Sequence, residues 1–369
     1  MLEYVPMNVL HIDEQSDWRG GEQQASWLIQ GTLAAGHTIA LAGKPGAPFL
    51  ERAAGDAHVP TLALPFRGEG DLYTAWRLAR YMREAGVDIL HAHTSHAHAA
   101  AIVARILAGR GKVVVSRRVS FVPRANPFNR WKYNAPDLYL AVSGEVGHVL
   151  RAYGLPESKV AVVHSSVDLS RCDVPPLPRA ELGVAEDAYF IFSAGALVEH
   201  KDHALLLDVF ARFHATHPHA RLRIAGEGVL RGALERAIAA MGLGEAVALL
   251  GHRRDVPRIT RAADLYVSSS VSEGLGTSIL EALACGTPVV ATQAGGAAEM
   301  VRPEATGWLV PVRDADALAA AMLEAYASPE QARAMAIAGR ALVEEEYTAP
   351  RMVQRTLAKY EELMTAGRE

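Results

Sequence analysis

The 369-residue sequence has only two cysteines, Cys172 and Cys285, and no apolar run long enough to cross a membrane. Two distant cysteines cannot build the disulfide framework of a small secreted domain, and their spacing fits no metal-binding motif. A membrane-spanning helix needs about 18 or more consecutive apolar residues. The amino-terminal stretch MLEYVPMNVLHIDEQ also lacks the basic and apolar regions of an export signal. We therefore expect a cytoplasmic protein in a reducing compartment.

The sequence also lacks a strong excess of charge of either sign. Charged residues make up 21% of the chain and sum to a net charge of −4, which argues against nucleic acid as a partner. Hydrophobic residues make up 50% of the chain. A chain of this length and composition can bury a large core, and it is typical of a globular protein with about two or three domains.

Short apolar runs alternate with amphipathic segments along most of the chain. Such runs are typical of strands in parallel sheets, which are buried on both faces. The runs are MNVLHI, HTIALAG, TLALPF, VDILHAH, KVVVSR, DLYLAVS and KVAVVHS in the first half, and YFIFSAG, ARLRIAG, AVALLG, ADLYVSSS, TPVVAT and GWLVP in the second.

The alternation is interrupted at residues 168–188, where prolines and scattered charges predict a linker. We therefore predict an α/β fold with two doubly wound, Rossmann-like domains, 1–168 and 169–350, which face each other across a cleft. A helix at 351–369 is expected to pack back across their junction. Ligands of such domains bind beyond the carboxyl ends of the strands.

The segment SEGLGTSILEALACG places two glutamates around a glycine turn and the start of a helix. We predict that this helix begins at Thr277 or Ser278 and stops at Gly286. Backbone N–H groups at a helix N-terminus favour anions such as phosphate, whereas a carboxylate accepts hydrogen bonds from sugar hydroxyls. Glu273 and Glu281 are therefore predicted to hold hydroxyls on either side of a phosphate site. The alternative is a surface glutamate on an ordinary helix after a flexible loop.

These segments together resemble the retaining glycosyltransferases of family 4, which have two Rossmann-like domains in the GT-B fold and use nucleotide diphosphate sugars. The spacing of the two glutamates carries the resemblance, together with EALACGTPVVAT and GGAAEMV. Nearly the whole chain is covered, because five further segments are similar to the family in order and spacing: RGGEQQ (19–24), DILHAH (88–93), AVSGEV (141–146), SSVDLSR (165–171) and GALVEHKDH (195–203).

The resemblance implies that the first domain binds the acceptor and the second binds the donor. As catalytic residues, His93 would lie beside the transferred sugar, Lys201 would neutralise the departing diphosphate, and Glu273 would contact the donor sugar. The family commonly has an arginine directly after the glycine that matches Gly195, and here that position is Ala196. Lys201 would also bind the donor, and the other implied donor-binding residues are Gly20, Gly21, Gly195, Gly274, Leu275, Gly276, Thr277 and Glu281.

Two short motifs resemble cofactor sites without matching them. In RIAGEGVLRG the glycine spacing departs from the dinucleotide pattern G-x-G-x-x-G, so we expect Gly226 in a turn that borders the nucleotide rather than in an NAD site. The triplet DAD at 314–316 resembles a metal-binding motif but precedes a predicted helix, which favours an N-cap. A lysine and a helix N-terminus can stabilise a leaving diphosphate electrostatically. We therefore expect no metal ion and no other cofactor.

The histidines of HAHTSHAH leave three interpretations open. His91 and His93 alternate onto one face of a strand, while His96 and His98 are predicted to lie in the next helix. Such a cluster can bind a metal ion. We favour a cleft histidine that forms a hydrogen bond with the substrate, and packed residues at the end of a strand are the remaining alternative.

The stretch SRRVSFVPRANPFNRWKY, residues 116–133, is basic and aromatic and contains no acid. It suits an anionic membrane or an anionic glycan acceptor. The alternative is a basic surface loop whose aromatic residues pack inward. The residues assigned to this acceptor or membrane surface are Arg117, Arg118, Arg124, Arg130, Trp131 and Lys132.

The sequence thus predicts a metal-independent glycosyltransferase that moves a hexose-type unit from a UDP-, GDP- or ADP-linked donor to a hydroxyl of an envelope glycolipid or polysaccharide. Retention of the anomeric configuration is implied by the family alone. We expect the enzyme in the cytoplasm, at the inner face of the membrane. Two alternatives remain: a sugar-nucleotide epimerase would need acid/base carboxylates in the first domain, and a two-lobed solute-binding protein would need an export signal.

Overall fold

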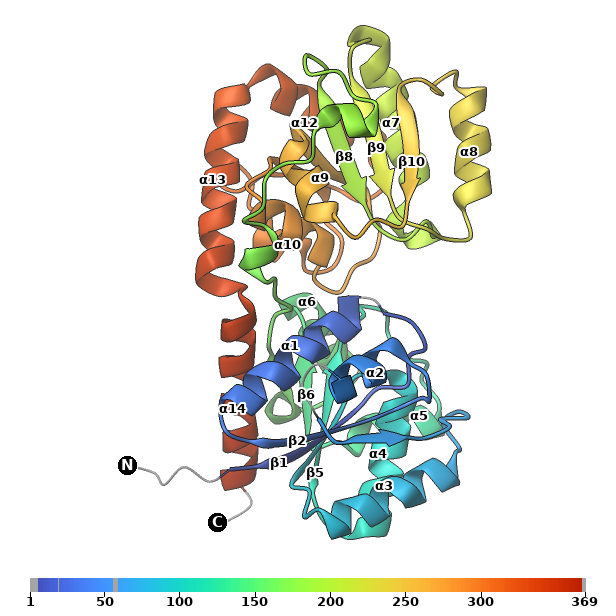
Figure 1. Ribbon diagram of the computed structural model, residues 1–369, viewed down its shortest axis with the longest axis vertical. Helices are drawn as coiled ribbons and strands as arrows, with labels where there is room; N and C mark the ends of the chain where they lie inside the picture. The colour runs from blue at the N-terminus through green and yellow to red at the C-terminus, as the bar shows by residue number, and fades with distance from the viewer. Residues whose placement is uncertain (1–5, 19, 56–58, 367–369) are drawn as a thin grey trace. The chain divides into compact units, whose positions relative to one another are not determined.

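The computed structural model describes residues 6–18, 20–55 and 59–366. These residues form two compact units, each with a sheet flanked by helices (Figure 1). The first unit comprises the described residues up to Ser165 together with those from Ala349 onward, and the second comprises Ser166–Thr348. The chain therefore leaves the first unit near the predicted domain boundary, and its last helix belongs to the first unit.

The first unit contains a seven-stranded parallel sheet with the strand order β3-β2-β1-β4-β5-β6-β7. The order reverses between β1 and β4, and in doubly wound sheets ligands bind beyond the strand ends at such a point. Each strand falls within a predicted apolar run: β1 (Asn8–Ile12), β2 (Thr38–Gly43), β3 (Thr61–Ala63), β4 (Ile89–Ala92), β5 (Lys112–Arg117), β6 (Leu138–Ala141) and β7 (Val160–Val162).

Helices cover both faces of this sheet (Figure 1). Several begin with a side chain that caps the free N–H groups of the first turn. Asp71 accepts from the Thr74 N–H at 3.0 Å and Asn126 accepts from the Asn129 N–H at 2.8 Å. The helices are α1 (Gly20–Ala34), α2 (Pro48–Gly55), α3 (Leu72–Glu84), α4 (Ser95–Ala108), α5 (Pro127–Asn134), α6 (Gly144–Ala152), the short 3-10 helix η1 (Glu157–Lys159), and α14 (Ala349–Thr365).

The second unit contains a six-stranded parallel sheet with the order β10-β9-β8-β11-β12-β13. All six strands were predicted: β8 (Phe190–Ala194), β9 (Arg221–Ala225), β10 (Val247–Gly251), β11 (Leu265–Ser268), β12 (Val289–Thr292) and β13 (Trp308–Val310). Its α-helices are α7 (His203–Thr216), α8 (Arg231–Ala240), α9 (Val256–Ala262), α10 (Thr277–Ala284), α11 (Ala297–Met300), α12 (Ala315–Ala327) and α13 (Pro329–Glu346). The 3-10 helices η2 (Leu169–Arg171) and η3 (Arg179–Leu182) lie in the predicted linker, and η4 (Glu199–Lys201) follows β8. Asp314 caps α12 by accepting from the Ala317 N–H at 2.9 Å, as predicted for the DAD triplet.

Each unit has its own apolar core. The last helix, α14, completes the core of the first unit by contributing Met352, Val353 and Tyr360. It packs closely on α1, because a Cβ atom placed on Gly31 would lie 2.4 Å from a Val353 methyl carbon. Residues from the end of the chain therefore help to stabilise the sheet that begins it.

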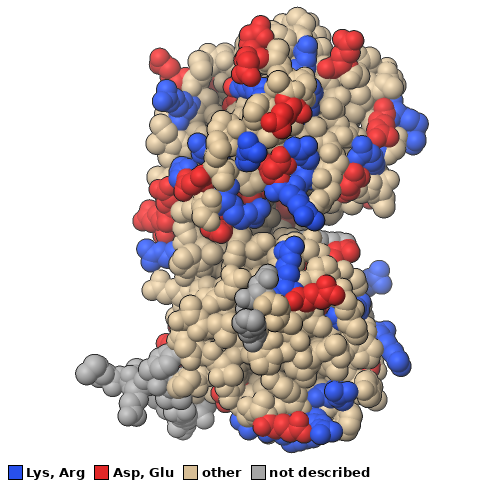
Figure 2. Space-filling model, in the orientation of Figure 1, with Lys and Arg blue, Asp and Glu red and all other residues tan. Residues whose placement is uncertain are grey.

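Charges are mixed over the surface of the second unit, where acidic and basic side chains lie beside one another on the face drawn in Figure 2. This pattern agrees with the nearly balanced composition. Among the helices of the described residues, none combines the length and the apolar character that a membrane span requires.

Candidate active site

The turn between β11 and α10 is tightly packed rather than flexible. Gly276 has a φ of +95°, a conformation that favours glycine. The Gly296 N–H donates to the Gly274 carbonyl at 3.0 Å. A Cβ atom on Gly295 would lie only 2.0 Å from the Glu273 carbonyl oxygen. The backbone at Gly295 therefore packs directly against this turn. The backbone around Glu273 is therefore held in one shape.

Helix α10 begins at Thr277, one of the two predicted start positions. Leu275 is buried, so its side chain supports the turn and only its backbone remains to contact a ligand. No side chain caps the first turn of α10, because its N-cap residue is Gly276. The arrangement has the form expected of a phosphate-binding helix N-terminus.

Lys201 and Glu273 form an ion pair, with 2.5 Å between Nζ and Oε1. Both side chains are largely buried, and the Ser270 hydroxyl donates to the same Glu273 oxygen at 2.7 Å. The Lys201 side chain lies across Gly195, where an added Cβ atom would be 3.3 Å from the lysine Cε. The structure thus brings together Gly195 and Lys201 from one predicted motif and Glu273 from another. An incoming anion would compete with Glu273 for the ammonium group.

Glu281 lies in α10 and is 17% exposed at its side chain. Burial raises its pKa, and the positive charge of Arg171, whose Nη2 lies 3.6 Å from a carboxylate oxygen, opposes this shift. Arg171 was not predicted as a site residue, although it ends the segment SSVDLSR. Only the fold shows that η2 meets α10.

Gly226 has a φ of +150° and packs against the turn after β8. A Cβ atom at this position would lie 1.9 Å from the Gly195 carbonyl oxygen, so only glycine fits. Tyr266 of β11 supports the same turn: its hydroxyl donates to the Ala194 carbonyl at 3.1 Å and accepts from the Ala194 N–H at 3.3 Å. These contacts position Gly195, the start of the segment that carries Lys201.

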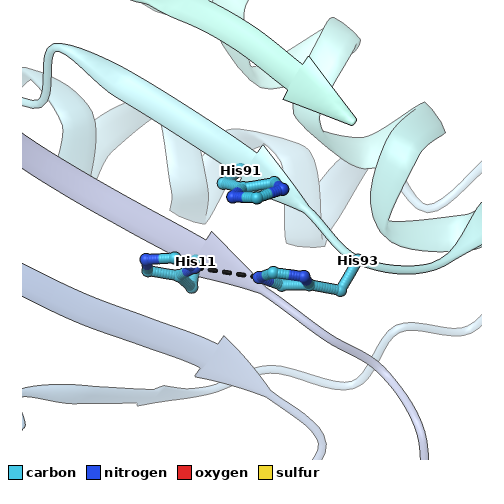
Figure 3. Close-up of side chains that lie close together, drawn as sticks. All are labelled: His11, His91 and His93. Carbon is cyan, nitrogen blue, oxygen red and sulfur yellow. Dashed lines mark hydrogen bonds between the residues drawn. The ribbon is translucent and has the colours of Figure 1, made fainter. Parts of the chain in front are cut away.

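In the first unit, three histidines lie together at the point where the strand order reverses (Figure 3). His11 from β1 and His93, just after β4, lie side by side, with His11 Nδ1 2.8 Å from His93 Nε2. His91 lies over them, and its ring nitrogens are 2.5 Å from the Tyr360 hydroxyl and 2.8 Å from the Ser116 hydroxyl. His11 was missed in the sequence because it lies within an ordinary apolar run, MNVLHI.

The partners of His93 define its tautomer. Arg118 Nη2, which can only donate, lies 3.1 Å from His93 Nδ1. His93 therefore carries its proton on Nε2 and donates it to His11. Burial lowers the pKa of His93 well below its usual value, with the charges of its neighbours adding to the effect, and burial lowers the pKa of His11 to about 3. These histidines are uncharged at neutral pH, and a sugar hydroxyl must displace Arg118 or His11 to bond to a His93 nitrogen.

One nitrogen from each of these histidines lies within 4.8 Å of the others, which is compatible in distance with a metal site. In the structure these nitrogens already have other partners. His11 Nδ1 and His93 Nε2 are hydrogen-bonded to each other, and the two ring nitrogens of His91 contact the Tyr360 and Ser116 hydroxyls.

Gly20 and Gly21 are the first residues of α1. Arg118 lies beside them, because a Cβ atom on Gly21 would be 3.6 Å from the arginine Nε. This end of α1 therefore faces the same guanidinium that contacts His93. Residue 19, part of the predicted segment RGGEQQ, lies outside the described residues.

Two buried carboxylates follow β1 and were not predicted. Asp13 is 4% exposed, and its Oδ2 has no partner among the described residues. Burial raises the pKa of Asp13 to about 7, partly opposed by the Gln15 N–H. Glu14 accepts from the Thr94 hydroxyl and from the Ala97 N–H, so it caps α4. The sequence HIDEQ places both carboxylates at the carboxyl end of a predicted strand, and this position could have identified them as candidate site residues.

Three of the six residues predicted for an acceptor or membrane surface, Arg117, Arg118 and Lys132, point inward and so do not lie on a membrane-facing surface. Arg117 and Lys132 are only 7% and 2% exposed. Lys132 forms an ion pair with Glu69 and donates to the Ser95 hydroxyl, and Arg118 turns toward His93. The cations point inward because partners from other segments lie there. The residues that remain exposed are Arg124, Arg130 and Trp131.

A groove of about 1120 Å³ lies elsewhere in the second unit. Tyr189, Asp264 and Pro288 line it, and they come just before β8, β11 and β12. The groove is thus at the amino ends of these strands, opposite the ends that carry Lys201 and Glu273. None of the predicted site residues lines it.

Comparison with known families matches both halves of the chain. Residues 18–171 match the family model described as Glycosyltransferase Family 4, and residues 177–342 match Glycosyl transferases group 1. The chain belongs to glycosyltransferase family 4. The resemblance inferred from the two glutamates and the glycine turns is therefore confirmed.

Relatives support this family assignment. The chain is 28% identical to the putative glycosyltransferase EpsD of Bacillus subtilis, a match that spans 58% of each chain and so less than two thirds of EpsD. It is 24% identical to N-acetyl-alpha-D-glucosaminyl L-malate synthase of Bacillus anthracis over 77% of each chain. Among solved structures, HepE from Anabaena in complex with UDP has a TM-score of 0.85 at 21% identity, covering 96% of this chain and 100% of that one. The likeness to HepE shows the fold, the GT-B fold predicted from the sequence.

One position departs from the pattern expected for family 4. Ala196, where the family commonly has an arginine, is exposed, and Lys201 folds back over the neighbouring Gly195. Arg171 supplies a second cation in the same unit, but it lies beside Glu281 rather than Lys201.

Proposed function

We propose that this protein is a metal-independent, retaining glycosyltransferase that moves a hexose-type unit from a nucleotide diphosphate sugar to a hydroxyl of an envelope glycolipid or polysaccharide. The observation that carries the proposal is an ion pair. It joins Lys201, at the end of η4, to Glu273, on the rigid turn before α10. A cation, a carboxylate and the N-terminus of a helix lie together there. These are the groups that a diphosphate and a sugar need.

The chemistry follows from where charge develops. When the bond between the anomeric carbon and the diphosphate breaks, negative charge grows on the leaving oxygen. Once the bound donor has drawn Lys201 away from Glu273, the lysine and the N–H groups of α10 are in place to stabilise that charge. Glu273, released from Lys201 by the incoming diphosphate, is then free to accept from sugar hydroxyls. The Glu281 carboxylate, which lies 3.6 Å from Arg171, is suited to accept from the two ribose hydroxyls.

In the first unit, neutral His93 can accept a hydrogen bond from a hydroxyl at Nδ1 if Arg118 moves away. It can donate from Nε2 if His11 moves away. Its uncharged state suits it to contact a sugar without repelling the positive charge that develops on the ring. We assign it to the transferred sugar, as the family resemblance implies.

The nucleotide is proposed to be UDP, GDP or ADP. UDP is the first to test, because HepE, which shares the fold, was crystallised with UDP. Titration calorimetry of the full chain with the three diphosphates tests the proposal. Tight binding of one of them supports a donor site. Consumption of the matching nucleotide sugar only when an acceptor is present separates a transferase from an epimerase, which would convert the donor alone.

Peripheral association with an anionic membrane is the second part of the proposal. Phe121 and Val122 are 62% and 64% exposed, and Trp131 is 43% exposed. Arg124 and Arg130 lie in the same stretch. Aromatic and basic side chains together favour a surface of anionic lipids, with about 1 kcal/mol from each basic residue near the surface.

Sedimentation with phosphatidylserine vesicles tests this second part. The variant Arg124→Gln/Arg130→Gln should lose binding at low salt, while a variant at exposed Arg80 on α3 should retain it. Failure of the unaltered chain to sediment would rule out the membrane role and leave the transferase assignment in place.

A further inference from the structure

A cavity of about 250 Å³ lies in the first unit, at the carboxyl ends of β4 and β5. Arg117, Arg118, His93, Ser95 and Tyr133 are among the residues that line it, and none of its lining residues is Asp or Glu. Two cations, hydroxyl groups and no acid make this a positively charged cavity beside the candidate sugar-contacting histidine.

Arg117 is the more deeply buried of the two cations. Its guanidinium donates to the Tyr133 hydroxyl at 2.9 Å and to the Phe121 carbonyl at 2.6 Å, and it lies 4.5 Å from the centroid of the Phe121 ring. Its buried Nε has no hydrogen-bond partner among the described residues. None of the ion pairs formed within the described part of the chain includes Arg117. The contacts orient the charge but do not neutralise it.

Arg118 has the same combination of burial and missing partner. One Nη contacts His93, and its Nε is buried without a hydrogen-bond partner in the described residues. The charges of Asp13 and Glu22 act on it, but within the described ranges neither forms an ion pair with it. Because Arg118 also lines the cavity, its guanidinium can meet an anion there while one Nη remains in contact with His93.

Two neighbouring buried cations that form no ion pair within the described residues are costly, because a charge removed from water must be compensated by pairing. Arginine favours planar or tetrahedral oxyanions, to which it donates two parallel hydrogen bonds. A cavity of this size holds a phosphate or carboxylate group and part of the molecule that carries it, not a nucleotide.

We propose that this cavity binds an anionic group of the acceptor, a phosphate or a carboxylate, through Arg117 and Arg118. The inference rests on the proposed function, because it takes His93 as the residue beside the transferred sugar. Arg118 links the two sites: with one Nη on His93 and the rest of its guanidinium on the anion, it aligns the acceptor next to the histidine. The acceptor class is therefore a hydroxyl compound that carries a negative charge close to the reacting hydroxyl.

Thermal unfolding of the full chain, with methyl phosphate or acetate as probe and sodium chloride to keep the ionic strength constant, tests the proposal. A ligand that binds only the folded state raises the Tm. We expect one of the two probes to raise it by a few degrees at millimolar concentration, and the more effective probe identifies the anion class. Arg118→Gln should abolish the shift. Arg110→Gln, at an arginine of the same unit that is 44% exposed, should leave it unchanged.

An equal shift in Arg118→Gln and the unaltered chain, or no shift with either probe, would overturn the proposal. A shift lost in Lys201→Ala but kept in Arg118→Gln would place the anion in the donor unit, which overturns this inference and leaves the proposed function intact. Failure of all three nucleoside diphosphates to bind would instead count against the proposed function. If Arg117→Gln does not fold, Arg118→Lys, which keeps the charge but not the planar fork, should reduce the shift.

Discussion

At the residue scale, the strongest effect on rate is expected at Lys201. Its charge is balanced by Glu273 before the donor binds and is needed most when the diphosphate departs. Lys201→Ala should therefore lower kcat at saturating donor by about a hundredfold, the scale of losing one preorganised electrostatic group. Steady-state kinetics measure this, with Lys159→Ala in the first unit as the control. A change confined to KM would mean that Lys201 only binds the donor.

Glu281→Ala should weaken nucleoside diphosphate binding, measured by titration calorimetry, by about 1–3 kcal/mol, the cost of unmade charged hydrogen bonds.

Glu281 and Arg171 together give a prediction about pH. Burial raises the pKa of Glu281 and Arg171 lowers it, so Arg171→Gln should raise this pKa further. Because the ionised form accepts the hydroxyls, affinity should be lost at a higher pH in Arg171→Gln as the pH falls. Calorimetry between pH 5 and 8 measures this, and identical profiles would contradict it.

Not all of these residues were visible in the sequence. Glu273, Glu281 and Lys201 stand in motifs with characteristic glycines. In the structure, Glu273 and Lys201 form an ion pair. His11 and Arg171 stand in unremarkable positions. Their roles depend on which strand or helix lies beside them, and a single sequence does not contain that information.

At the element scale, the contact between α1 and α14 can be tested by adding one methyl group. Gly31→Ala would normally stabilise a helix by about 1 kcal/mol. Here the new Cβ atom would lie 2.4 Å from a Val353 methyl carbon, so we expect a net loss of about 1–3 kcal/mol from overpacking. The Tm of the first unit measures it. Val353→Ala should restore stability in the double variant, and additive losses would show that the two residues do not meet.

The elements themselves were predictable because parallel strands buried on both faces appear as continuous apolar runs. All thirteen strands of the described residues fall within such runs. Residues 116–133, which span the end of β5, a loop and most of α5, were less predictable. Arg117 and Lys132 point inward because Tyr133, Glu69 and Ser95 contact them there, and two of these three partners come from other segments of the chain.

At the scale of the whole molecule, buried histidines predict sensitivity to acid. Burial lowers the pKa of His98 to about 3 from an ordinary value of 6.5. Between these values the unfolded chain binds a proton that the folded chain does not, so stability present above pH 6.5 is lost as the pH falls. Each such histidine adds about 1.4 kcal/mol per pH unit to this loss.

The Tm of His98→Gln should therefore fall less steeply with decreasing pH than the Tm of the unaltered chain. Its glutamine amide can still donate to the Lys132 carbonyl, which His98 contacts at 3.0 Å. Calorimetric scans between pH 4 and 7 follow the Tm of each transition. His148→Gln, at an exposed histidine of the same unit, is the control. Equal slopes for His98→Gln and the control would contradict the prediction.

We propose that the second unit binds a nucleoside diphosphate through Lys201 and Glu281 without a metal ion. Titration calorimetry of UDP, GDP and ADP, in buffer with and without EDTA, measures this binding. We predict that one diphosphate binds with the same affinity in both buffers, and that Lys201→Ala and Glu281→Ala each weaken it. Binding that EDTA abolishes, or that neither substitution changes, would contradict the account.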